Sequence, residues 1–353
     1  MVFQYKCPDC GADLKFDANQ GMIACENCGH TEKVEEMTGD GQLRQSTDTD
    51  HQDVPMEDSS VVSYQCQNCG AFVMTDKNTT ATKCSFCQAP IILGDRLEGM
   101  LKPDYCIPFK IDRQTADLAF KKWAKRLRFS PMDFRKSVKV KKVEGLYAPF
   151  WVYNCIGQGE AMLKCTTSHH YTEGSYDVTE TNHYDVYRSV DTTFKGIPAD
   201  ASERLEDRLM DIMEPFDYSQ LVKFEAPYLT GYLAEKYDYT DKEMFPRVQK
   251  RVSNYMDSYI LDSVHGYDTK NISERHYNIN RSYTSYCLFP IWINYVTYKD
   301  KDYSFAMNAE TGKIAGKPPI SVPNVLAHIG VSTVAIFILL RLLVVLLGGT
   351  FLW

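Results

Sequence analysis

The stretch CPDCGADLKFDANQGMIACENCG, residues 7–29, sets the fold at the start of this chain, and CQNCGAFVMTDKNTTATKCSFCQ, residues 66–88, nearly repeats it. In each copy, two C-x-x-C pairs are separated by fourteen residues, and the second copy follows the first at a spacing of 59 residues. Further residues keep the same register: Tyr5 and Tyr64, Gly11 and Gly70, Ala12 and Ala71, Asp17 and Asp76, Asn19 and Asn78. Two copies of one small module explain this repeat.

The spacing of the cysteines indicates metal binding. A C-x-x-C pair in a tight turn brings two thiolates to about 2.3 Å from a tetrahedral zinc ion. Four such ligands leave no open position, so the metal is structural and replaces a core that about 25 residues cannot build. An iron–sulfur cluster or a rubredoxin-type iron is the alternative. We predict two structural Zn²⁺ ions, held by Cys7, Cys10, Cys25 and Cys28 in the first module and by Cys66, Cys69, Cys84 and Cys87 in the second.

Composition and charge limit the classes of function. The chain has 353 residues, 44% of them hydrophobic, which is enough for two or three domains with their own cores. Its net charge is -7, and residues 31–60 alone carry nine acids and two bases. This acidic stretch lacks periodicity and predicts a solvated linker between the modules. The overall charge does not favour nucleic acid as a partner.

The first residues, MVFQYKCPDC, contain neither a basic segment nor an apolar core, so we expect no signal peptide. A reducing compartment follows, in which clustered cysteines bind metal and do not form disulfides. The remaining cysteines share no ligand spacing and are expected to be buried apolar residues: Cys106, Cys155, Cys165 and Cys287. The pair His169–His170 is expected in a polar loop, without a role.

A basic amphipathic helix follows the second module. IPFKI at 107–111 is typical of a short strand, and apolar residues then recur at helical spacing from about Arg113. Residues 121–142 hold ten Lys or Arg and one Asp. A solvated face is the ordinary meaning of such a run. Contact with acidic lipid headgroups is the sharper interpretation, through Lys121, Lys122, Lys125, Arg126 and Arg128.

Strand patterns rich in aromatic and β-branched residues occupy 145–155 and 287–314. Both contain a Pro-x-Trp-x segment, at 149–152 and 290–293, which predicts two related strands in one sheet. One helix is expected to run to Met213, capped by Asp200 with Glu203, and another to open with Thr240 and Glu243. We therefore predict an α+β domain. The chain contains no G-x-S-x-G, phosphate loop, H-E-x-x-H or glycine fingerprint, so an enzyme is not expected.

The end of the chain is strongly apolar. Residues 329–347 hold one charge in nineteen, and as a helix they are about 28 Å long, which is enough to cross the hydrocarbon. Lys313 and Lys317 flank the N-terminal side of this segment, so we expect a single-pass tail anchor with the body in the cytoplasm. The one charge, Arg341, either snorkels to the far headgroups or pairs with a polar residue of another membrane subunit.

These parts together carry a resemblance. YKCPDCGADLKFD, YQCQNCGA, RLEGMLKPDYCIPFKID, GLYAPFWVY and YSFAMNAETGKIAG resemble the bacterial TFIIB-type zinc-ribbon membrane proteins, the YdjG-like family, over nearly the whole chain. The resemblance implies association with flotillin-like and phage-shock-type membrane-stress proteins and implies no catalytic activity.

The predicted architecture is multidomain, with two four-cysteine zinc ribbons, a middle α+β domain and one C-terminal transmembrane helix. Its parts are ribbon 1 over 1–30, an acidic flexible linker over 31–62, ribbon 2 over 63–95, the α+β domain over 96–320 and the membrane helix over 325–352. We expect an adaptor that recruits protein partners to the cytoplasmic face of the cell membrane. The alternative is a nucleic-acid-binding ribbon protein of replication or transcription, although acids offset the few bases of both modules. The sequence does not determine whether the chain forms oligomers.

Overall fold

The computed structural model describes residues 2–3, 5–37, 61–66, 72–76, 78–84, 89–93, 102–140 and 143–346. The chain forms two compact units. Unit 1 consists of Met1–Pro108, Tyr147–Asp211 and Asp217–Phe289. Unit 2 consists of Phe109–Leu146, Ile212–Phe216 and Pro290–Trp353.

Unit 1 is built on a mixed sheet. Its strands follow the order β1 (Val2–Phe3), β8 (Pro90–Leu93), β7 (Thr79–Lys83), β13 (Leu233–Glu235), β10 (Glu144–Glu173) and β14 (Thr269–Tyr298). Strand β11 (Tyr176–Asp200) pairs antiparallel with β10. Strand β9 (Tyr105–Cys106) pairs with β12 (Val222–Lys223) and runs parallel to β14. The remaining short elements of this region are α4 (Asp207–Met213), whose last two residues belong to unit 2, η3 (Tyr218–Gln220) and η4 (Ala226–Leu229).

The four-cysteine modules also belong to unit 1. The first contains β2 (Leu14–Asp17), β3 (Met22–Cys25), β4 (Thr31–Glu32) and α1 (Val34–Met37), with strand order β2-β3-β4. The second contains the β5–β6 hairpin (Val61–Gln65 and Phe72–Asp76) and the paired strands β7 and β8. Because β7 also pairs with β13, the second module shares the sheet that contains β10.

The ends of the expected acidic linker are structured. Residues 31–32 and 34–37 form β4 and α1, and residues 61–62 belong to β5. The reason is local burial, since Val34 is 2% exposed and β4 pairs with β3. Residues 38–60, which hold most of the acidic stretch, lie outside the described residues.

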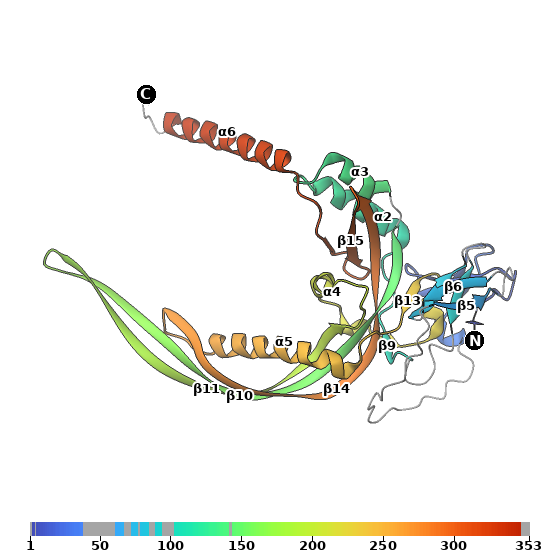
Figure 1. The fold of residues 1–353 in the computed structure, drawn as a ribbon, viewed down its shortest axis with the longest axis horizontal. Helices are drawn as coiled ribbons and strands as arrows, with labels where there is room; N and C mark the ends of the chain where they lie inside the picture. Colours follow the sequence, from blue (N-terminus) through green and yellow to red (C-terminus); the bar gives the residue numbers. More distant parts are fainter. Residues whose placement is uncertain are drawn as a thin grey trace. The chain divides into compact units, whose positions relative to one another are not determined.

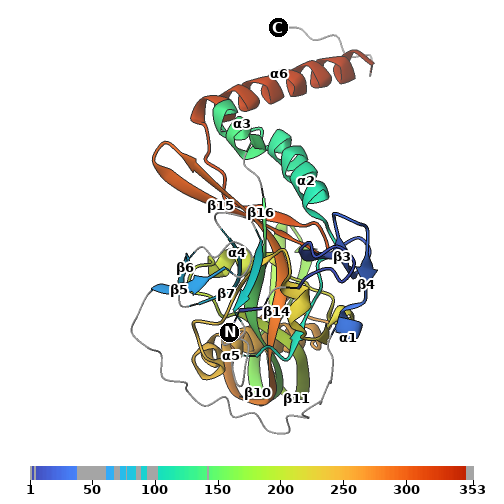
Figure 2. The ribbon, with the colours of Figure 1, turned by 90° about the vertical axis from the view of Figure 1, so that its right-hand side faces the viewer.

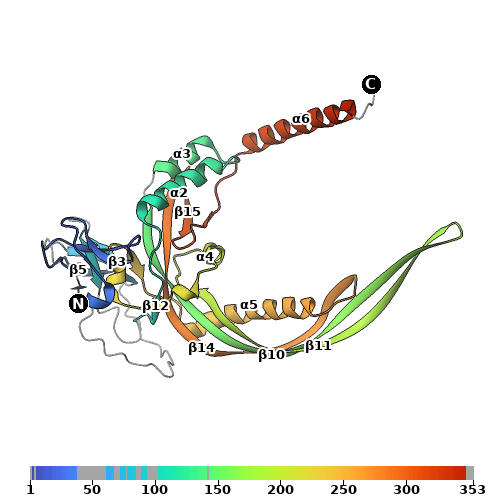
Figure 3. The same ribbon diagram turned by 180° about the vertical axis from the view of Figure 1, so that it is seen from behind.

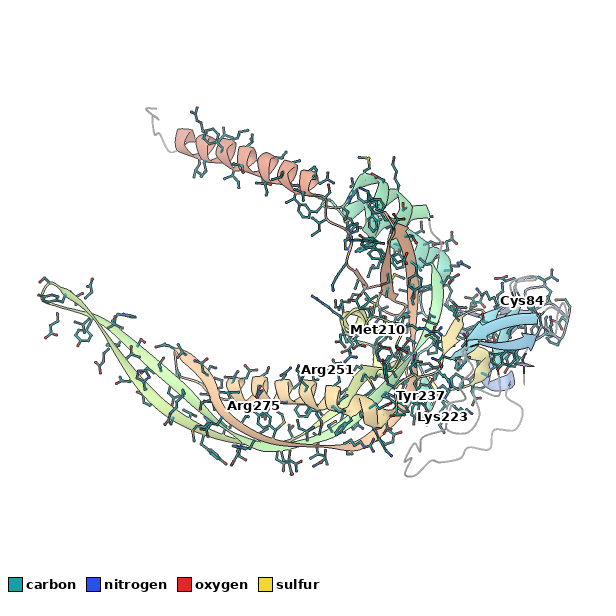
Figure 4. All side chains as sticks on the ribbon, in the orientation of Figure 1. Cys84, Met210, Lys223, Tyr237, Arg251 and Arg275 are labelled. Atoms are coloured by element: carbon teal, nitrogen blue, oxygen red, sulfur yellow. The ribbon has the colours of Figure 1, made fainter. Side chains whose placement is uncertain are left out.

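A long helix, α5 (Asp241–Asp262), covers the extended strands of unit 1 (Figures 1 and 3). Its buried apolar residues recur every fourth position: Met244, Val248, Val252, Met256 and Ile260. Polar bonds hold α5 on both sides. Arg251 Nη1 donates to Pro198 O of β11 (2.8 Å), and Asp257 forms an ion pair with Arg275 of β14 (Figure 4).

Two glycines allow this close packing. A Cβ at Gly157 would lie 2.9 Å from Met256 Sδ of α5. A Cβ at Gly159 would lie 2.2 Å from the carbonyl oxygen of His276 in β14. Backbone cannot yield as a side chain can, so position 159 requires glycine.

The β10–β11 hairpin extends beyond the rest of the unit 1 sheet (Figure 3). Strand β14 begins at Thr269, and Asp268 N donates to Thr166 O of β10. Beyond that point, residues 168–181 form a two-stranded ribbon, which we call the arm. No residue from 168 to 185 is buried. The expectation of a loop at His169–His170 is wrong, because these residues lie in β10 and pair with Glu180 and Thr179.

Unit 2 packs two helices on a short antiparallel sheet. It contains α2 (Arg113–Arg126), α3 (Met132–Val140), the end of β14, β15 (Lys301–Asn308), β16 (Ile314–Gly316) and α6 (Val322–Leu346). Aromatic rings form its core. Phe305 packs against Trp123 at 5.0 Å between ring centroids and against Phe134 at 5.9 Å.

The same local structure occurs once in each unit, around the Pro-x-Trp-x segments; we call it the tryptophan corner. In unit 1, Trp151 Nε1 donates a 2.8 Å hydrogen bond to the carbonyl of Tyr239. Tyr239 directly precedes Thr240, the N-cap residue of α5. Two backbone bonds complete the corner, because Ala201 N donates to Pro149 O and Tyr239 N donates to Ala201 O.

The corner of unit 2 repeats every one of these bonds. Trp292 Nε1 donates a 2.9 Å hydrogen bond to the carbonyl of Ile111, which directly precedes Asp112, the N-cap residue of α2. Ala309 N donates to Pro290 O, and Ile111 N donates to Ala309 O. The sequence prediction of two related strands in one sheet is confirmed, since β10 and β14 are neighbours.

Two predicted helix starts are confirmed, whereas one predicted cap and one predicted strand are wrong. The helix start near Arg113 is confirmed, and α5 opens with the predicted capping box of Thr240 and Glu243. The expected cap at Asp200 is wrong. Asp200 is the last residue of β11, and the helix begins at Asp207. The strand expected at 107–111 is also wrong, because the chain there is irregular after β9. Its backbone donates one bond to Leu288 O and two bonds to Ala309 O.

Candidate metal centre

Two similar turns bring the cysteines of the first module together. After Cys7, Gly11 N donates to Cys7 O (2.9 Å), and Gly29 N donates to Cys25 O (3.0 Å) in the same way. Gly11 and Gly29 have φ of +73° and +80°, a region that side chains rarely adopt. Each turn is closed by a bond from the first cysteine to the residue five positions later, Cys7 N to Ala12 O and Cys25 N to His30 O.

The four sulfurs of this module form one cluster. Their Sγ atoms all lie within 4.8 Å of one another, and two contacts, Cys7–Cys28 and Cys10–Cys25, measure 3.5 Å. A tetrahedral ion with bonds of about 2.3 Å requires sulfurs about 3.8 Å apart. The cluster can therefore hold one metal ion. Cys7 and Cys25 are buried, whereas Cys10 and Cys28 are exposed.

The electrostatics of the cluster also suit a cation. Hydrogen bonds with the Asn27 side chain and the Ala12 backbone lower the pKa of Cys10 to about 6. At Cys28 the backbone of His30 pulls the pKa down, but the sulfurs of Cys7 and Cys10 outweigh it and raise the pKa to about 12. Four thiolates at this spacing repel one another, and a divalent cation removes that repulsion.

A polar link outside the four cysteines joins the two turns. His30 Nδ1 lies 2.8 Å from Asp9 Oδ2, so the residue after the second turn contacts the middle of the first. Sequence reasoning missed this pair, although Asp9 and His30 stand beside the cysteines. Such partners orient metal-binding loops. The module is also fixed to the rest of unit 1, since Phe16 N donates to Thr230 O and the Phe16 ring contacts Tyr228 at 5.3 Å.

The second module is described in part. Cys66 and Cys84 are buried at 1% and 0% exposure in one apolar cluster with Ile91 and Leu93 (Figure 4). Cys84 N donates to Ala89 O (2.9 Å), which is the closing bond seen in both turns of the first module. Cys69 and Cys87 lie outside the described residues. None of the ten described cysteines forms a disulfide.

A comparison with curated proteins gives one full-length relative. The chain is 39% identical over 351 residues to the uncharacterized protein YdjG of Bacillus subtilis (strain 168), covering 99% of this chain and 100% of that protein. The chain belongs to the YdjG family. No family model matches it, and no solved structure matches it.

Outside the two modules, the other cysteines of this YdjG-family protein behave as expected. Cys106, Cys155, Cys165 and Cys287 are all buried. Burial raises the pKa of the Cys106 and Cys287 thiols, which keeps them protonated. They are core residues of unit 1.

The C-terminal helix of this YdjG-family protein is apolar and uncovered. Among the described residues, one helix is long and apolar enough to cross a membrane, at Val322–Leu343, and none of it is buried. Arg341 lies within it, with its guanidinium 5.5 Å from the centre of the Phe337 ring. The prediction that Arg341 pairs with another subunit stays a prediction.

The basic residues singled out in the sequence lie in unit 2. Lys121, Lys122, Lys125 and Arg126 belong to α2, and Arg128 follows it. All five are exposed, and the structure gives them no carboxylate partner in the part of the chain that it describes. The buried face of α2 is the opposite one, formed by Ala116, Phe120 and Ala124.

Proposed function

We propose that this protein is a membrane-anchored adaptor, with two TFIIB-type zinc ribbons, that recruits protein partners to the cytoplasmic face of the cell membrane. The uncovered α6 carries the proposal. A helix of 25 residues, most of them apolar and none of them covered, would be strongly unfavourable in water, and a bilayer is the environment that suits it. Each ribbon holds one structural Zn²⁺, which agrees with a closed set of four sulfurs.

The arm of unit 1 is the surface that we assign to partner binding. An isolated two-stranded hairpin is marginally stable in water, so fourteen residues with no buried side chain favour a covering partner. Exposed tyrosines are typical of protein interfaces. Tyr171 and Tyr176 are 42% and 75% exposed on the arm, and Tyr184 and Tyr187 continue the series below it.

The charge of the arm indicates the chemistry of the partner. Residues 168–181 contain three acids, Glu173, Asp177 and Glu180, and no Lys or Arg. In addition, β11 pairs only with β10 among the described strands, so one of its edges can accept another strand. A basic protein surface that adds to this edge fits both features.

The competing function, nucleic-acid binding, has less support. The two lysines of the first ribbon form ion pairs, Lys6 with Asp13 and Lys15 with Glu26. Phosphate contacts require free cations. We therefore place the protein in a membrane complex, with flotillin-like or phage-shock-type proteins as the partners that the family resemblance suggests.

The test is purification of the full chain from detergent-solubilised membranes, with and without nuclease. One variant replaces residues 168–181 with an Asn-Gly turn, which shortens the hairpin without changing its register. We expect this variant to remain in the membrane fraction and to lose its protein partners. The control variant carries Asp262→Asn and Glu274→Gln, which remove acids of unit 1 outside the arm, and should keep the partners. A shortened chain that recovers every partner, or partners that nuclease removes, would contradict the proposal.

A further inference from the structure

The loop between α2 and α3 holds the start of α6. Ser321 N donates a 2.7 Å hydrogen bond to Phe129 O, and Asn324 Nδ2 donates a 2.9 Å bond to Ser130 O. The Phe129 ring also contacts the His328 ring, at 5.1 Å between centroids. Figure 2 shows α2, α3 and the first turns of α6 beside one another. The first two turns of α6 are thus fixed to this loop within unit 2.

These contacts set the depth of the loop relative to the apolar run. His328 directly precedes Ile329, where the apolar run begins. From Ile329 to Leu346 the helix is about 27 Å long, close to the hydrocarbon thickness of a bilayer. Phe129 therefore lies level with the boundary between hydrocarbon and headgroups when α6 crosses a membrane.

The side chains around Phe129 combine apolar and cationic groups. Phe129 is 50% exposed and Met132 is 61% exposed, although both are large apolar residues at the tip of unit 2. Arg126 and Arg128 precede Phe129 in the chain and are exposed. On α2, the exposed Leu118 lies on the same face as Lys122 and Lys125, opposite the buried face. This mixture is typical of segments that lie in a membrane interface.

We infer that this α2–α3 corner is a second membrane contact, which binds anionic lipid headgroups through Arg126, Arg128 and the lysines of α2 and inserts Phe129 and Met132 at the acyl boundary. The inference rests on the proposed membrane anchoring by α6. Each Lys or Arg close to an anionic leaflet strengthens attachment about fivefold. The contact would add to the orientation that the fixed first turns of α6 give unit 2 on the bilayer.

A phosphate-binding site for a soluble ligand would carry cations without exposed apolar residues among them, whereas Phe129 and Met132 stand beside the arginines. A second copy of the chain is the other candidate for covering the patch. Neither alternative accounts for the contact between this loop and the start of α6. A lipid surface does account for it, because α6 brings the loop to the level of the headgroups when it crosses a membrane. Each of these two alternatives predicts a different result in the hydrogen-exchange test.

The test is hydrogen exchange of residues 127–132 in the full chain, reconstituted singly into nanodiscs of phosphatidylcholine with or without phosphatidylglycerol. We expect exchange to slow about fivefold or more in the anionic discs and to recover at high salt. Arg126→Gln with Arg128→Gln should abolish the slowing. Lys195→Gln with Lys250→Gln, which neutralises two exposed lysines of unit 1, should keep it.

Co-elution with the discs reports anchoring separately. A chain that fails to enter the discs overturns both the anchor and the lipid contact. A chain that enters them but exchanges equally in both lipids overturns the lipid contact alone. Slowing by soluble glycerophosphate in phosphatidylcholine discs, or slowing only with two chains per disc, would assign the patch to a soluble ligand or to a second copy, and each would overturn the proposal.

Discussion

The two tryptophan corners use the same bonds and lead to different surfaces. In unit 1, Phe150 pairs with Asp200, so the corner encloses a hairpin of about fifty residues that ends in the arm. In unit 2, Ile291 pairs with Asn308, and the hairpin between them has about eighteen residues. The corner needs only the short version, because all of its bonds lie at the base of the hairpin. The extra length in unit 1 is therefore an addition to the scaffold, which is why we assign a function to it.

The helices that start at the two corners differ in a similar way. Both begin at an N-cap residue preceded by the carbonyl that a tryptophan binds. The α5 helix lies along the long strands of unit 1, with five buried apolar residues at every fourth position. The α2 helix buries three residues and exposes a basic face next to the start of α6. The corner fixes where each helix begins, and the outer residues decide what it contacts.

Removal of metal should give the largest difference in stability between the two units. Apparent binding energies of structural zinc are about 10–16 kcal/mol, so a strong chelator should unfold residues 5–37 and their contact with Thr230. Unit 2 has no four-cysteine cluster among its described residues, so α2 and α3 should keep their hydrogen-exchange protection. Elemental analysis of the untreated chain should give two zinc ions. Iron, a single metal per chain, or parallel loss of protection in both units would contradict this prediction.

Replacing Gly159 should lower the folding stability of unit 1 alone. In Gly159→Ala the new Cβ would lie 2.2 Å from His276 O, so β10 and β14 must separate where these two residues meet. We expect a loss of about 4 kcal/mol or more in the unfolding free energy of unit 1, measured by urea denaturation with hydrogen exchange of α5. Gly330→Ala is the control, because its Cβ meets nothing within 4 Å. Unchanged exchange of α5 in Gly159→Ala would show that the close approach is not required.

Equivalent positions at the two corners differ in their ability to titrate. Asp200 and Asn308 both accept hydrogen bonds from the backbone two residues later, Ser202 N and Glu310 N. Burial is the main cause that raises the pKa of Asp200 to about 8. Its Oδ2 is buried without a hydrogen-bond partner among the described groups, as expected for a site that favours the protonated acid.

The sign of the pH effect follows from this raised pKa. The folded state binds the proton more tightly than the unfolded state, so the stabilisation is complete below about pH 4 and is lost as the pH rises to about 8. The difference in unfolding free energy between Asp200→Asn and the parent chain should therefore change by roughly 3 kcal/mol between pH 5 and pH 8, in favour of the variant at high pH. Asn308→Asp is the converse variant and should introduce a pH dependence into unit 2. A pH-independent difference for Asp200→Asn would mean that Asp200 stays ionised when buried.

Sequence patterns foresaw the local elements better than their arrangement. The C-x-x-C spacing predicted the sulfur cluster, and helical periodicity with a capping box located α2 and α5. The repeated Pro-x-Trp-x segment indicated two related strands. The rest depended on contacts between distant residues. The bond from Trp292 to Ile111 joins residues 181 apart, and no local pattern marks a carbonyl as its acceptor.

The same reason explains the errors. Asp200 and Glu203 match a capping box by residue type, but pairing of Asp200 with Phe150 extends β11 to that point. His169 and His170 are polar enough for a loop, yet the β10–β11 ladder continues through them. The depth of the α2–α3 corner depended on the contact of Phe129 with His328, almost 200 residues later in the chain. Pairing across the chain overrode local propensity in each case.

The smallest expected effect tests the corners themselves. Trp151→Phe and Trp292→Phe each keep an aromatic ring and remove one indole donor, which leaves the carbonyl of Tyr239 or Ile111 without its bond. Both bonds are partly buried, and the loss of such a hydrogen bond costs about 0.5–1.5 kcal/mol. Trp151→Phe should speed hydrogen exchange in the first turns of α5 and leave α2 unchanged, and Trp292→Phe should do the reverse.

Val152→Ala and Ile293→Ala, at the next positions of the two strands, remove side-chain volume and keep the indole donor. These control variants should lower the stability of their own unit without a preferred effect on the first turn of the helix. If either tryptophan variant changes both helices equally, the two corners do not act as independent supports, and the comparison between the units fails.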